Sequence, residues 1–413
     1  MTTQAMFERH AETVLGVTPG EDEELALPVS GGHPLPIELS LHTDLVAIEK
    51  DWRAFEERAD CTVFQTFDWL SAWHRHIGVR ENAKPAIVIG RQQDAILFVM
   101  PFAFDAETRT IGWFGAGLCN YNGPVLAREF SRRVGPERFP ALWDQVRRLL
   151  RNSMPLDLID LDKMPAMIGE QANPFCALSV TPHVNNAYST ALAADWETFY
   201  ESKRSASTRR SDRKKQRRIT EFGELRFGTA EGRDEIAKTL DALIEEKRVS
   251  YAKLGVDNMF ERPGYRDFYL DLATGEHSAP MTHLSRIDVG AEVAAANFGL
   301  VHRGTYIYLL AGYNDGEVGR FGPGSMQLLE IFQYAIARGM KVFDFTIGDE
   351  PYKRDWNDTE TQLYDHASPV TLRGWVAFIR FRAMREIKRH VRKNPAIWAV
   401  ARKVRFMLSA LRR

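Results

Sequence analysis

Residues 322–352 read GPGSMQLLEIFQYAIARGMKVFDFTIGDEPY, and this stretch decides the fold. A Gly-Pro-Gly-Ser turn comes first. Apolar residues then recur at helical spacing as far as Gly339, which is a typical helix stop. The strand pattern KVFDFTI follows at once and ends in the polar cluster Gly-Asp-Glu-Pro-Tyr-Lys. This order predicts an α/β unit whose chemistry lies at the turn and at the strand end.

The Gly-Pro-Gly-Ser turn is suited to hold a phosphate. Gly322 and Gly324 can adopt backbone angles that other residues avoid, so N–H groups can converge on an anion at the start of the helix. Ser325 adds a hydroxyl, and Arg320 and Lys353 are cationic candidates for the same phosphates. A phosphate at this position indicates a coenzyme A donor.

Length and composition limit the class of protein. The chain has 413 residues, of which 44% are hydrophobic, and this is enough for two ordinary domain cores. No apolar run approaches the roughly 20 residues that span a bilayer, and the first 15 residues show no signal region. These features predict a cytoplasmic location. Cys61, Cys119 and Cys176 lack metal-ligand spacing, so we assign them to packing.

The second half of the chain repeats the order of the first. A Gly-Pro pair precedes a helix and then a strand in both halves, and the distance from the glycine to the strand aspartate is 25 residues for Asp160 and 22 for Asp344. The three strands expected upstream match in order: AIVIG, AILFVMPFAF and TIGWFG against HLSRIDVG, EVAAANFGLVH and TYIYLLAGYN. The repeat predicts two copies of one α/β unit. Only the second copy keeps Gly-Pro-Gly-Ser, so the active site is expected there.

This repeat predicts four regions along the chain. They are a loosely ordered leader at 1–36, an N-terminal unit at 37–190 without a donor site, a C-terminal unit at 191–372 with one, and a basic helical tail at 373–413. Residues 374–413 hold twelve Lys and Arg against Glu386 alone, a net charge of +11. The whole chain carries −1, so the remainder carries −12.

The tail reads as two amphipathic helices broken at Asn394-Pro395. Such basic helices can lie on an anionic membrane surface, and the alternative is that their apolar faces dock on the body of the protein. A second basic segment, residues 203–218, has nine basic residues against Asp212. No aromatic residue is interleaved, so specific nucleic-acid binding is not expected. The charge could meet a phosphorylated acceptor, a lipid-linked precursor or tRNA, or form a solvated helix face.

Two stretches carry a resemblance to a known family. FQTFDWLSAW (64–73) and FDFTIGDEPYKRDW (343–356) resemble the cellulose-biosynthesis-type acetyltransferases of the GNAT superfamily. That family is similar in fold to the Fem-type aminoacyl transferases, which carry two GNAT units in tandem. The resemblance implies acyl-CoA as donor and an amine or hydroxyl of a carbohydrate, polysaccharide or envelope precursor as acceptor. The Gly-Pro-Gly loop is one residue shorter than the usual GNAT phosphate loop, which keeps two alternatives open: an aminoacyl-tRNA donor and a non-catalytic membrane-surface scaffold.

Direct acyl transfer needs a base for the acceptor proton, donors for the carbonyl oxygen and an acid for the departing thiolate. The resemblance implies that Tyr352 is the acid. Asp349 or Glu350 could be the base, and Asp344 is a further catalytic candidate that could instead be satisfied by backbone. The structural alternative for this cluster is a capped turn, in which Pro351 begins a helix that follows acidic residues.

Two polar pairs at strand ends are predicted to line an acceptor groove between the units: Asn120-Tyr121 and Tyr313-Asn314. No carboxylate accompanies the imidazoles of the first unit, and no Gly-x-Ser-x-Gly elbow is present. We therefore expect direct transfer without a metal and without a covalent enzyme intermediate.

Overall fold

A computed structural model describes residues 36–348 and 350–393 of the chain. Several sequence predictions lie outside these residues: the leader as far as residue 35, the catalytic candidate Asp349, and the part of the tail after Lys393. Everything below concerns the described residues.

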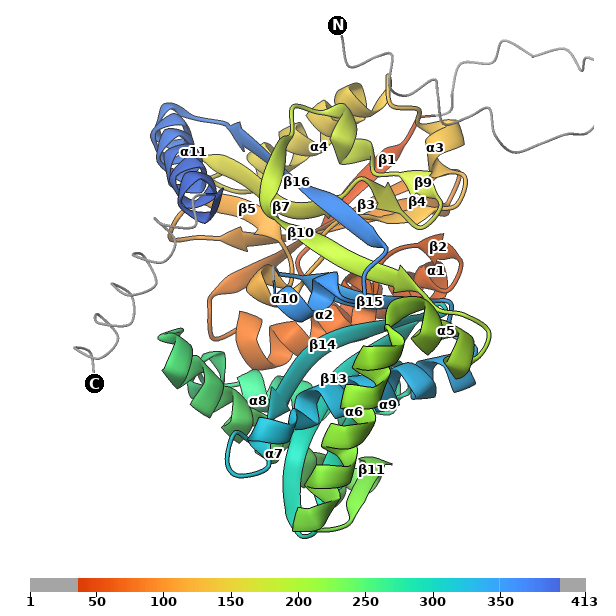
Figure 1. Cartoon of the computed structure of the whole chain (residues 1–413). Helices are drawn as coiled ribbons and strands as arrows, with labels where there is room; N and C mark the ends of the chain where they lie inside the picture. The colour runs from red at the N-terminus through yellow and green to blue at the C-terminus, as the bar shows by residue number, and fades with distance from the viewer. Residues whose placement is uncertain (1–35, 349, 394–413) are drawn as a thin grey trace, which may run out of the picture. The chain divides into compact units, whose positions relative to one another are not determined.

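The fold is mixed α/β (Figure 1), and both halves share a core order of one strand, two helices, three strands, one helix and two strands, with additional elements in each. The elements of the first half are β1 (Glu38–His42), α1 (Glu49–Glu56), β2 (Ala59–Asp60), α2 (Phe67–Trp73), β3 (Ala83–Gln92), β4 (Ala95–Asp105), β5 (Thr110–Trp113), β6 (Val125–Ala127), α3 (Phe130–Arg133), α4 (Phe139–Ser153), β7 (Leu158–Pro165), β8 (Met167–Ile168), β9 (Gln171–Ala172), the short η6 (Pro174–Ala177) and β10 (Thr181–Ala191).

The elements of the second half are α5 (Trp196–Lys203), α6 (Ala206–Ile219), β11 (Leu225–Thr229), α7 (Gly232–Leu254), α8 (Tyr265–Thr274), β12 (Thr282–Val289), β13 (Glu292–His302), β14 (Thr305–Tyr313), the short η10 (Gly319–Phe321), α9 (Pro323–Ala337), β15 (Val342–Ile347), α10 (Pro351–Arg354), β16 (Thr359–Pro369) and α11 (Leu372–Lys393). None of the helices in the described residues is long and apolar enough to cross a membrane.

The helix and the strand predicted within residues 322–352 both form. Gly322 takes a left-handed φ of 73° directly before Pro323, the first residue of α9. The helix ends at Ala337, and Gly339 follows with a φ of 71°. Strand β15 comes next. Glycine can adopt these left-handed angles at no steric cost, so both ends of the helix are fixed locally.

One sheet runs through both halves, in the order β1-β3-β4-β5-β7-β16-β10-β15-β14-β13-β12-β11. Strand β10, the last of the first half, pairs with β15 of the second half, and β16, the last of the second half, pairs with β7 of the first. The halves therefore exchange their final strands. The predicted boundary at residue 190 falls at the end of β10, and it stays a prediction.

Helices α7 and α9 cover opposite faces of β13 and β14. One core joins α7 to the strands and to the first half through these buried residues: Leu240, Leu243, Phe298, Leu300 and Ile307. A second core joins α9 to the other face through another set: Tyr306, Tyr308, Ile331, Phe332, Phe343 and Phe345. Alternate residues of β14 and β15 thus point to opposite sides of the sheet, as the two-residue period of a strand requires.

In each half, two parallel strands pair only at their beginnings and then separate. Strands β5 and β7 pair at Thr110–Leu158 and Ile111–Ile159, and we call the separation beyond these pairs the β5/β7 fork. Strands β14 and β15 pair over Thr305–Ile307 and Val342–Asp344, and their separation is the β14/β15 fork. A helix connects the two strands of each fork, α4 in the first half and α9 in the second. The structure thus contains the predicted repeat.

Irregular backbone accompanies the β14/β15 fork on both of its strands. The register of β14 against β13 shifts where Leu310 pairs with Phe298 and Tyr308 with Gly299, so Leu309 is the extra residue of a bulge. On β15, Thr346 has a left-handed φ of 61°, and the neighbouring Phe345 is the extra residue of a bulge against β10. Bulges bend strands, and they often lie next to functional sites.

Candidate functional site

Three aromatic side chains meet at the β14/β15 fork on the α9 face of the sheet. The ring of Tyr352, on α10, lies 6.5 Å from that of Tyr308 and 6.2 Å from that of Phe345, edge-on to both. Tyr352 is 37% exposed, so its hydroxyl lies at the border between core and solvent. Burial raises the pKa of Tyr352 above its usual range, and the phenol is therefore protonated and available as a proton donor.

Asp344 lies at the same fork on the opposite face. Its Oδ1 accepts hydrogen bonds of 2.7 Å from the Tyr121 hydroxyl and 2.7 Å from the Thr346 amide. The left-handed Thr346 turns its amide toward the carboxylate, a conformation that costs on the order of 1 kcal/mol. Burial raises the pKa of Asp344 to about 6, although both hydrogen bonds lower it. A carboxylate with this pKa is ionised at neutral pH and still basic enough to take a proton.

A cavity of about 670 Å³ opens beside Asp344, between the two halves of the sheet. This volume is typical of small-molecule sites. Most of its polar lining comes from the following residues: Asp60, Thr62, Tyr121, Arg128, Glu170, Gln171, His302, Arg303, Thr305 and Asp344. The lining mixes hydrogen-bond donors and acceptors of both charges, and it would suit a polar ligand with several hydroxyl or amine groups.

His302 adds a free acceptor to this cavity. Burial and the neighbouring Arg303 lower the pKa of His302 to about 4, so its imidazole is neutral. The His302 Nε2 atom is buried and has no hydrogen-bond partner in the described part of the chain. Cys61 also lines the cavity, but burial raises the pKa of its thiol to about 12. A protonated thiol is a poor nucleophile, which argues against a covalent intermediate on this residue.

Sequence reasoning missed a buried carboxylate on α7. Glu246 packs against Gly312 of β14, where a Cβ atom would come within 2.7 Å of the Glu246 Oε2 atom. Burial raises the pKa of Glu246 to about 8, although a backbone hydrogen bond from Ala296 lowers it. Burial also lowers the pKa of the adjacent Lys247. A signal was present, because Leu240, Leu243 and Glu246 follow a three-residue spacing along one helix face.

The predicted phosphate turn lies at the other end of β14. Gly324 packs against Tyr313, whose Cδ1 atom would be 3.2 Å from an added Cβ. The amides of Ser325 and Met326 both donate to the Gly322 carbonyl, at 3.0 and 3.2 Å. Within the described residues, the Gly324 amide, which is also in the first turn of the helix, forms no such hydrogen bond. The loop therefore offers one backbone amide and the Ser325 hydroxyl, fewer donors than the sequence suggested.

The two predicted phosphate-binding cations point elsewhere. The Arg320 guanidinium lies over the rings of Phe222 and Phe321, at 5.7 and 5.0 Å from their centroids. Lys353 is buried, and its ammonium donates to the Ile347 carbonyl at 2.8 Å and pairs with Glu350 at 2.9 Å. The ammonium of Lys353 is thus held by groups at and just after the end of β15. Arg320, which is exposed, could reach a phosphate only by leaving its aromatic neighbours.

The four predicted acceptor residues do not gather at one place. Tyr121 contacts Asp344, and the half-buried Asn120 precedes it. Tyr313 and Asn314 lie at the far end of β14, six residues or about 20 Å from the pairing of Ile307 with Asp344. Asn314 there accepts a turn hydrogen bond from the Gly316 amide at 2.8 Å. Tyr121 therefore belongs to the cavity, whereas Tyr313 and Asn314 lie beside the predicted phosphate turn, residues 320–325, which we call the donor loop.

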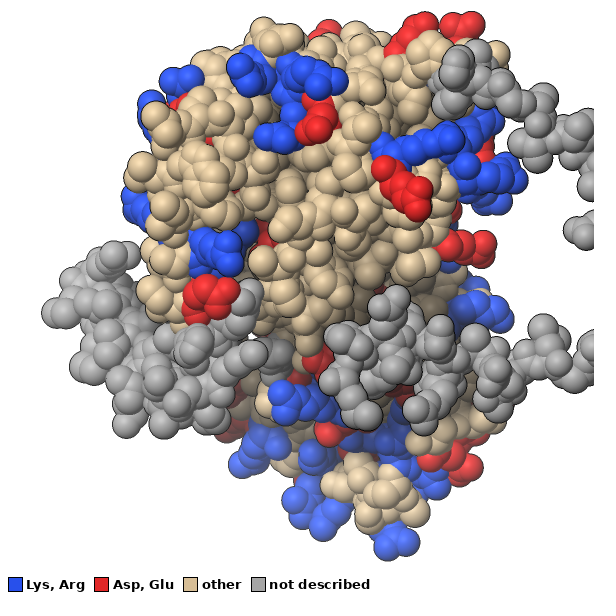
Figure 2. Space-filling model, turned by 90° about the horizontal axis from the view of Figure 1, so that it is seen from above, with Lys and Arg blue, Asp and Glu red and all other residues tan. Residues whose placement is uncertain are grey.

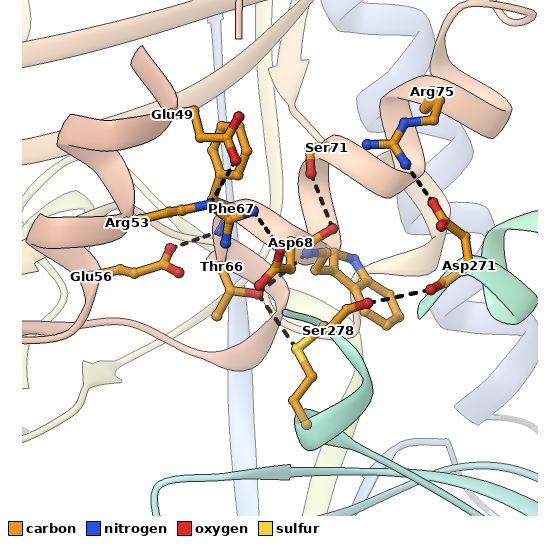
Figure 3. Close-up of polar contacts among 12 residues, drawn as sticks. Glu49, Arg53, Glu56, Thr66, Phe67, Asp68, Ser71, Arg75, Asp271 and Ser278 are labelled. Atoms are coloured by element: carbon orange, nitrogen blue, oxygen red, sulfur yellow. Dashed lines mark hydrogen bonds and ion pairs between the residues drawn. The ribbon is translucent and has the colours of Figure 1, made fainter. Parts of the chain in front are cut away.

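A second cavity, of about 440 Å³, lies between α1, α2 and α8 (Figure 3). Arg53 reaches Glu49 and Asp68 there, at 2.8 and 2.7 Å. Asp271 of α8 pairs with Arg75 at 2.8 Å and with His76 at 2.9 Å. These charges are satisfied by one another, and the Asp271 contacts join the two halves. We therefore assign this region to structure. Nowhere in residues 36–348 and 350–393 do three His, Cys, Asp or Glu residues gather as a metal site.

Comparison with known proteins agrees with this geometry. Residues 206–354 match the sequence model of the family described as "Acetyltransferase (GNAT) domain". This segment runs from α6 to α10 and contains the β14/β15 fork, so the second half is similar to a GNAT acetyltransferase domain, and this match supports a transferase. A search of curated proteins found no match in sequence.

Solved structures resemble nearly the whole described fold. FemX has a TM-score of 0.53 at 11% identity, with 79% of this chain and 96% of FemX covered. The C-terminal domain of a putative lysylphosphatidylglycerol synthetase from Agrobacterium fabrum has a TM-score of 0.49 at 12% identity, covering 81% and 96%. A tandem GNAT protein from the clavulanic acid biosynthesis pathway has a TM-score of 0.42 at 10% identity, covering 81% and 98%.

At this level of identity, the likeness to FemX shows the fold alone. The predicted fold class of two GNAT-like α/β units is confirmed. The narrower resemblance to the cellulose-biosynthesis-type family stays a prediction.

Proposed function

We propose that the protein transfers an acyl group from acyl-CoA directly to an amine or hydroxyl group of a polar acceptor in the 670 Å³ cavity. One observation carries the proposal: the β14/β15 fork has a carboxylate with a pKa of about 6 on one face and a protonated tyrosine on the other. Asp344 and Tyr352 supply the base and the acid of a direct transfer, and the GNAT match supports the class of reaction.

The donor would extend along the fork from the α9 loop. Its phosphates would lie by the Gly324 amide and the Ser325 hydroxyl, at the positive N-terminus of a 15-residue helix. The roughly 20 Å from this loop to Asp344 is comparable with an extended phosphopantetheine arm. Because the loop has only one unused backbone amide, we expect it to bind phosphate more weakly than a loop with several backbone donors would.

The acceptor would react on the Asp344 side. The Asp344 carboxylate takes the proton of the amine or hydroxyl as its nitrogen or oxygen attacks the thioester carbonyl. The tetrahedral intermediate then expels the sulfur, and the Tyr352 phenol donates its proton to the departing thiolate. Tyr121 and the Thr346 amide hold the Asp344 carboxylate in place. The mixed polar lining favours a carbohydrate or a related envelope precursor as acceptor.

A second candidate donor is aminoacyl-tRNA, and the position of α6 favours it. Helix α6 lies against η10, which leads into the donor loop. Six basic residues of α6 are exposed and form no ion pair with the described chain: Arg210, Arg213, Lys214, Lys215, Arg217 and Arg218. The face seen in Figure 2 has an uncharged middle area, and basic side chains gather at its lower edge. A concentrated basic helix beside the donor loop would attract a polyanionic donor.

A donor panel tests the proposal. Purified protein is mixed with acetyl-CoA, longer acyl-CoAs or charged tRNA, and with amino sugars and sugars as acceptors. Thiol release or loss of the aminoacyl ester is then measured. We expect acceptor-dependent thiol release that is lost in Asp344→Asn. Transfer from charged tRNA alone would support the second candidate. No transfer from any donor would contradict both and leave the scaffold alternative.

A further inference from the structure

Helix α11 carries an apolar stripe on its outer face. Five large side chains at helical spacing are between 52% and 86% exposed: Leu372, Trp375, Val376, Ile379 and Ile387. Their positions fall within about one sixth of a turn on either side of a single line along the helix. In Figure 1, α11 is the outermost element on its side of the sheet. Exposed apolar patches of this kind mark interaction surfaces.

The opposite side of α11 is fixed to the sheet, so the helix cannot turn its stripe inward. At its start, Gly374 approaches Asp157 so closely that an added Cβ would lie 1.8 Å from the Asp157 carbonyl oxygen. The Thr371 hydroxyl donates to the Asp157 carboxylate at 2.7 Å. Three turns further on, Arg385 pairs with Asp160 at 2.9 Å and lies 3.7 Å from Asp365. These contacts set the rotation of the helix about its axis.

Basic side chains border the stripe. Arg373, Arg380 and Arg382 are all exposed, and Arg380 and Arg382 form no ion pair within the described residues. Glu386 is the one acidic residue between Leu372 and Lys393. An apolar stripe with Trp, Leu and Ile, bordered by arginines, is the pattern of a helix that lies in the plane of a membrane surface.

We propose that α11 binds an anionic lipid bilayer, with the stripe among the acyl chains and the bordering arginines at the lipid phosphates. Charge complementarity selects this partner over a second copy of the chain, because two such faces would bring their arginines together. The proposal does not depend on the donor or acceptor of the transferase site. It assigns the face of the protein that meets the membrane, which composition alone could not do.

Vesicle sedimentation of the full-length protein tests this proposal. One set of vesicles contains equal parts of phosphatidylcholine and phosphatidylglycerol, and the other contains phosphatidylcholine alone. We expect the protein to pellet with the first set and to be released by salt. Ile379→Glu should lower vesicle binding at least about tenfold, because it places a charge among the acyl chains. Replacing both Arg380 and Arg382 by Gln should lower it several-fold.

Val79→Glu is the matched control, because Val79 is 60% exposed and Ile379 is 61% exposed. This variant should bind as the wild type does, and circular dichroism should show that all variants remain folded. Equal binding of Ile379→Glu and the wild type would overturn the proposal. So would an absence of binding to anionic vesicles. If light scattering showed that the wild type is a dimer and that Ile379→Glu is a monomer, this would also overturn the proposal and assign the stripe to a contact with a second copy of the chain.

Discussion

The two forks of this protein share a backbone plan but differ in what fills them. In each fork, an aromatic residue that follows the second strand (β7 or β15) packs against an aromatic residue of the first strand (β5 or β14). The ring centroids of Phe175 of η6 and Trp113 of β5 are 5.3 Å apart, and those of Tyr352 of α10 and Tyr308 of β14 are 6.5 Å apart. Phe175 is fully buried and also packs on Phe139 and Trp143 of the first half. Tyr352 is 37% exposed and has a hydroxyl. One fork is thus part of a core, and the other is accessible to a substrate.

The strand aspartates differ in the same way. Burial raises the pKa of both Asp160 and Asp344 to about 6. Asp160, however, pairs with Arg385 of α11 at 2.9 Å, whereas Asp344 is held by a neutral phenol and faces the large cavity. A similar pKa therefore accompanies a structural ion pair in one half and a candidate base in the other. The environment, and not the residue type, separates the two roles.

The largest expected effect is on Asp344. Asp344→Asn should lower kcat by about 10² to 10⁴, because the amide cannot accept the acceptor proton. Asp160→Asn is the matched change in the first fork and should leave kcat unchanged while weakening the contact with Arg385. Steady-state kinetics with thermal unfolding measures both. Equal losses of kcat in the two variants would remove the distinction between the forks.

Tyr352→Phe should lower kcat by about 100-fold, the low end of the range for acid catalysis, since a thiolate leaves more readily than most groups. The reciprocal change is Phe175→Tyr, which adds a hydroxyl to a fully buried ring. It should cost about 1 to 3 kcal/mol of stability and leave kcat as it is. Wild-type turnover in Tyr352→Phe would show that the thiolate takes its proton from another donor.

The pH dependence of kcat/KM sharpens the assignment of the base. Asp344 must be ionised to take a proton, and its pKa is about 6. Activity should therefore rise about tenfold per unit as pH increases toward 6 and level off above it. The residual activity of Asp344→Asn should lack this limb. A limb near pH 8 in the wild type that disappears in Glu246→Gln would instead identify Glu246 as the base, since burial raises its pKa to about 8.

The smallest expected effect is on stability. Glu246 keeps its proton up to about pH 8 in the folded protein, whereas an ordinary glutamate loses it near 4.5. The unfolded chain thus binds fewer protons in this range, and stability should fall as pH rises from 4.5 to 8. Glu246→Gln removes this loss, so it should be more stable than the wild type at pH 8, and the difference in stability should shrink as pH falls toward 4.5.

Glu245→Gln is the control for this experiment, because Glu245 is exposed and pairs with Arg248. Its unfolding curves should follow the pH dependence of the wild type. Parallel stability curves for Glu246→Gln and the wild type would show that Glu246 ionises normally in the folded protein.

Local features of the fold were predictable, and its long-range pairing was not. Helix α9 and strand β15 follow from spacing and from glycine ends within 31 consecutive residues. The exchange of β10 and β16 between the halves depends on hydrogen bonds between strands far apart in the chain, which no local pattern records. The contact of Tyr121 with Asp344 joins residues 223 positions apart. The sequence shows that Tyr121 is polar and at a strand end, but it holds no sign of its partner.

The donor loop shows a different limit of sequence reasoning. The glycines of Gly-Pro-Gly-Ser predict a left-handed turn, and Gly322 does take a left-handed conformation. Hydrogen bonding within the turn decides which amides remain for a phosphate, and the turn uses two of them. Likewise, the charge of Lys353 suggests a phosphate ligand, but Lys353 is buried and its ammonium donates to the Ile347 carbonyl.

The central claim is that the β14/β15 fork holds the donor and the β5/β7 fork does not. Calorimetric titration with acetyl-CoA and longer acyl-CoAs tests it in two matched variants, Gly324→Glu in the second half and Gly135→Glu in the first. We predict that Gly324→Glu abolishes donor binding, because a carboxylate then occupies the phosphate position, and that Gly135→Glu binds as the wild type does. Loss of binding in Gly135→Glu with retention in Gly324→Glu would contradict the claim.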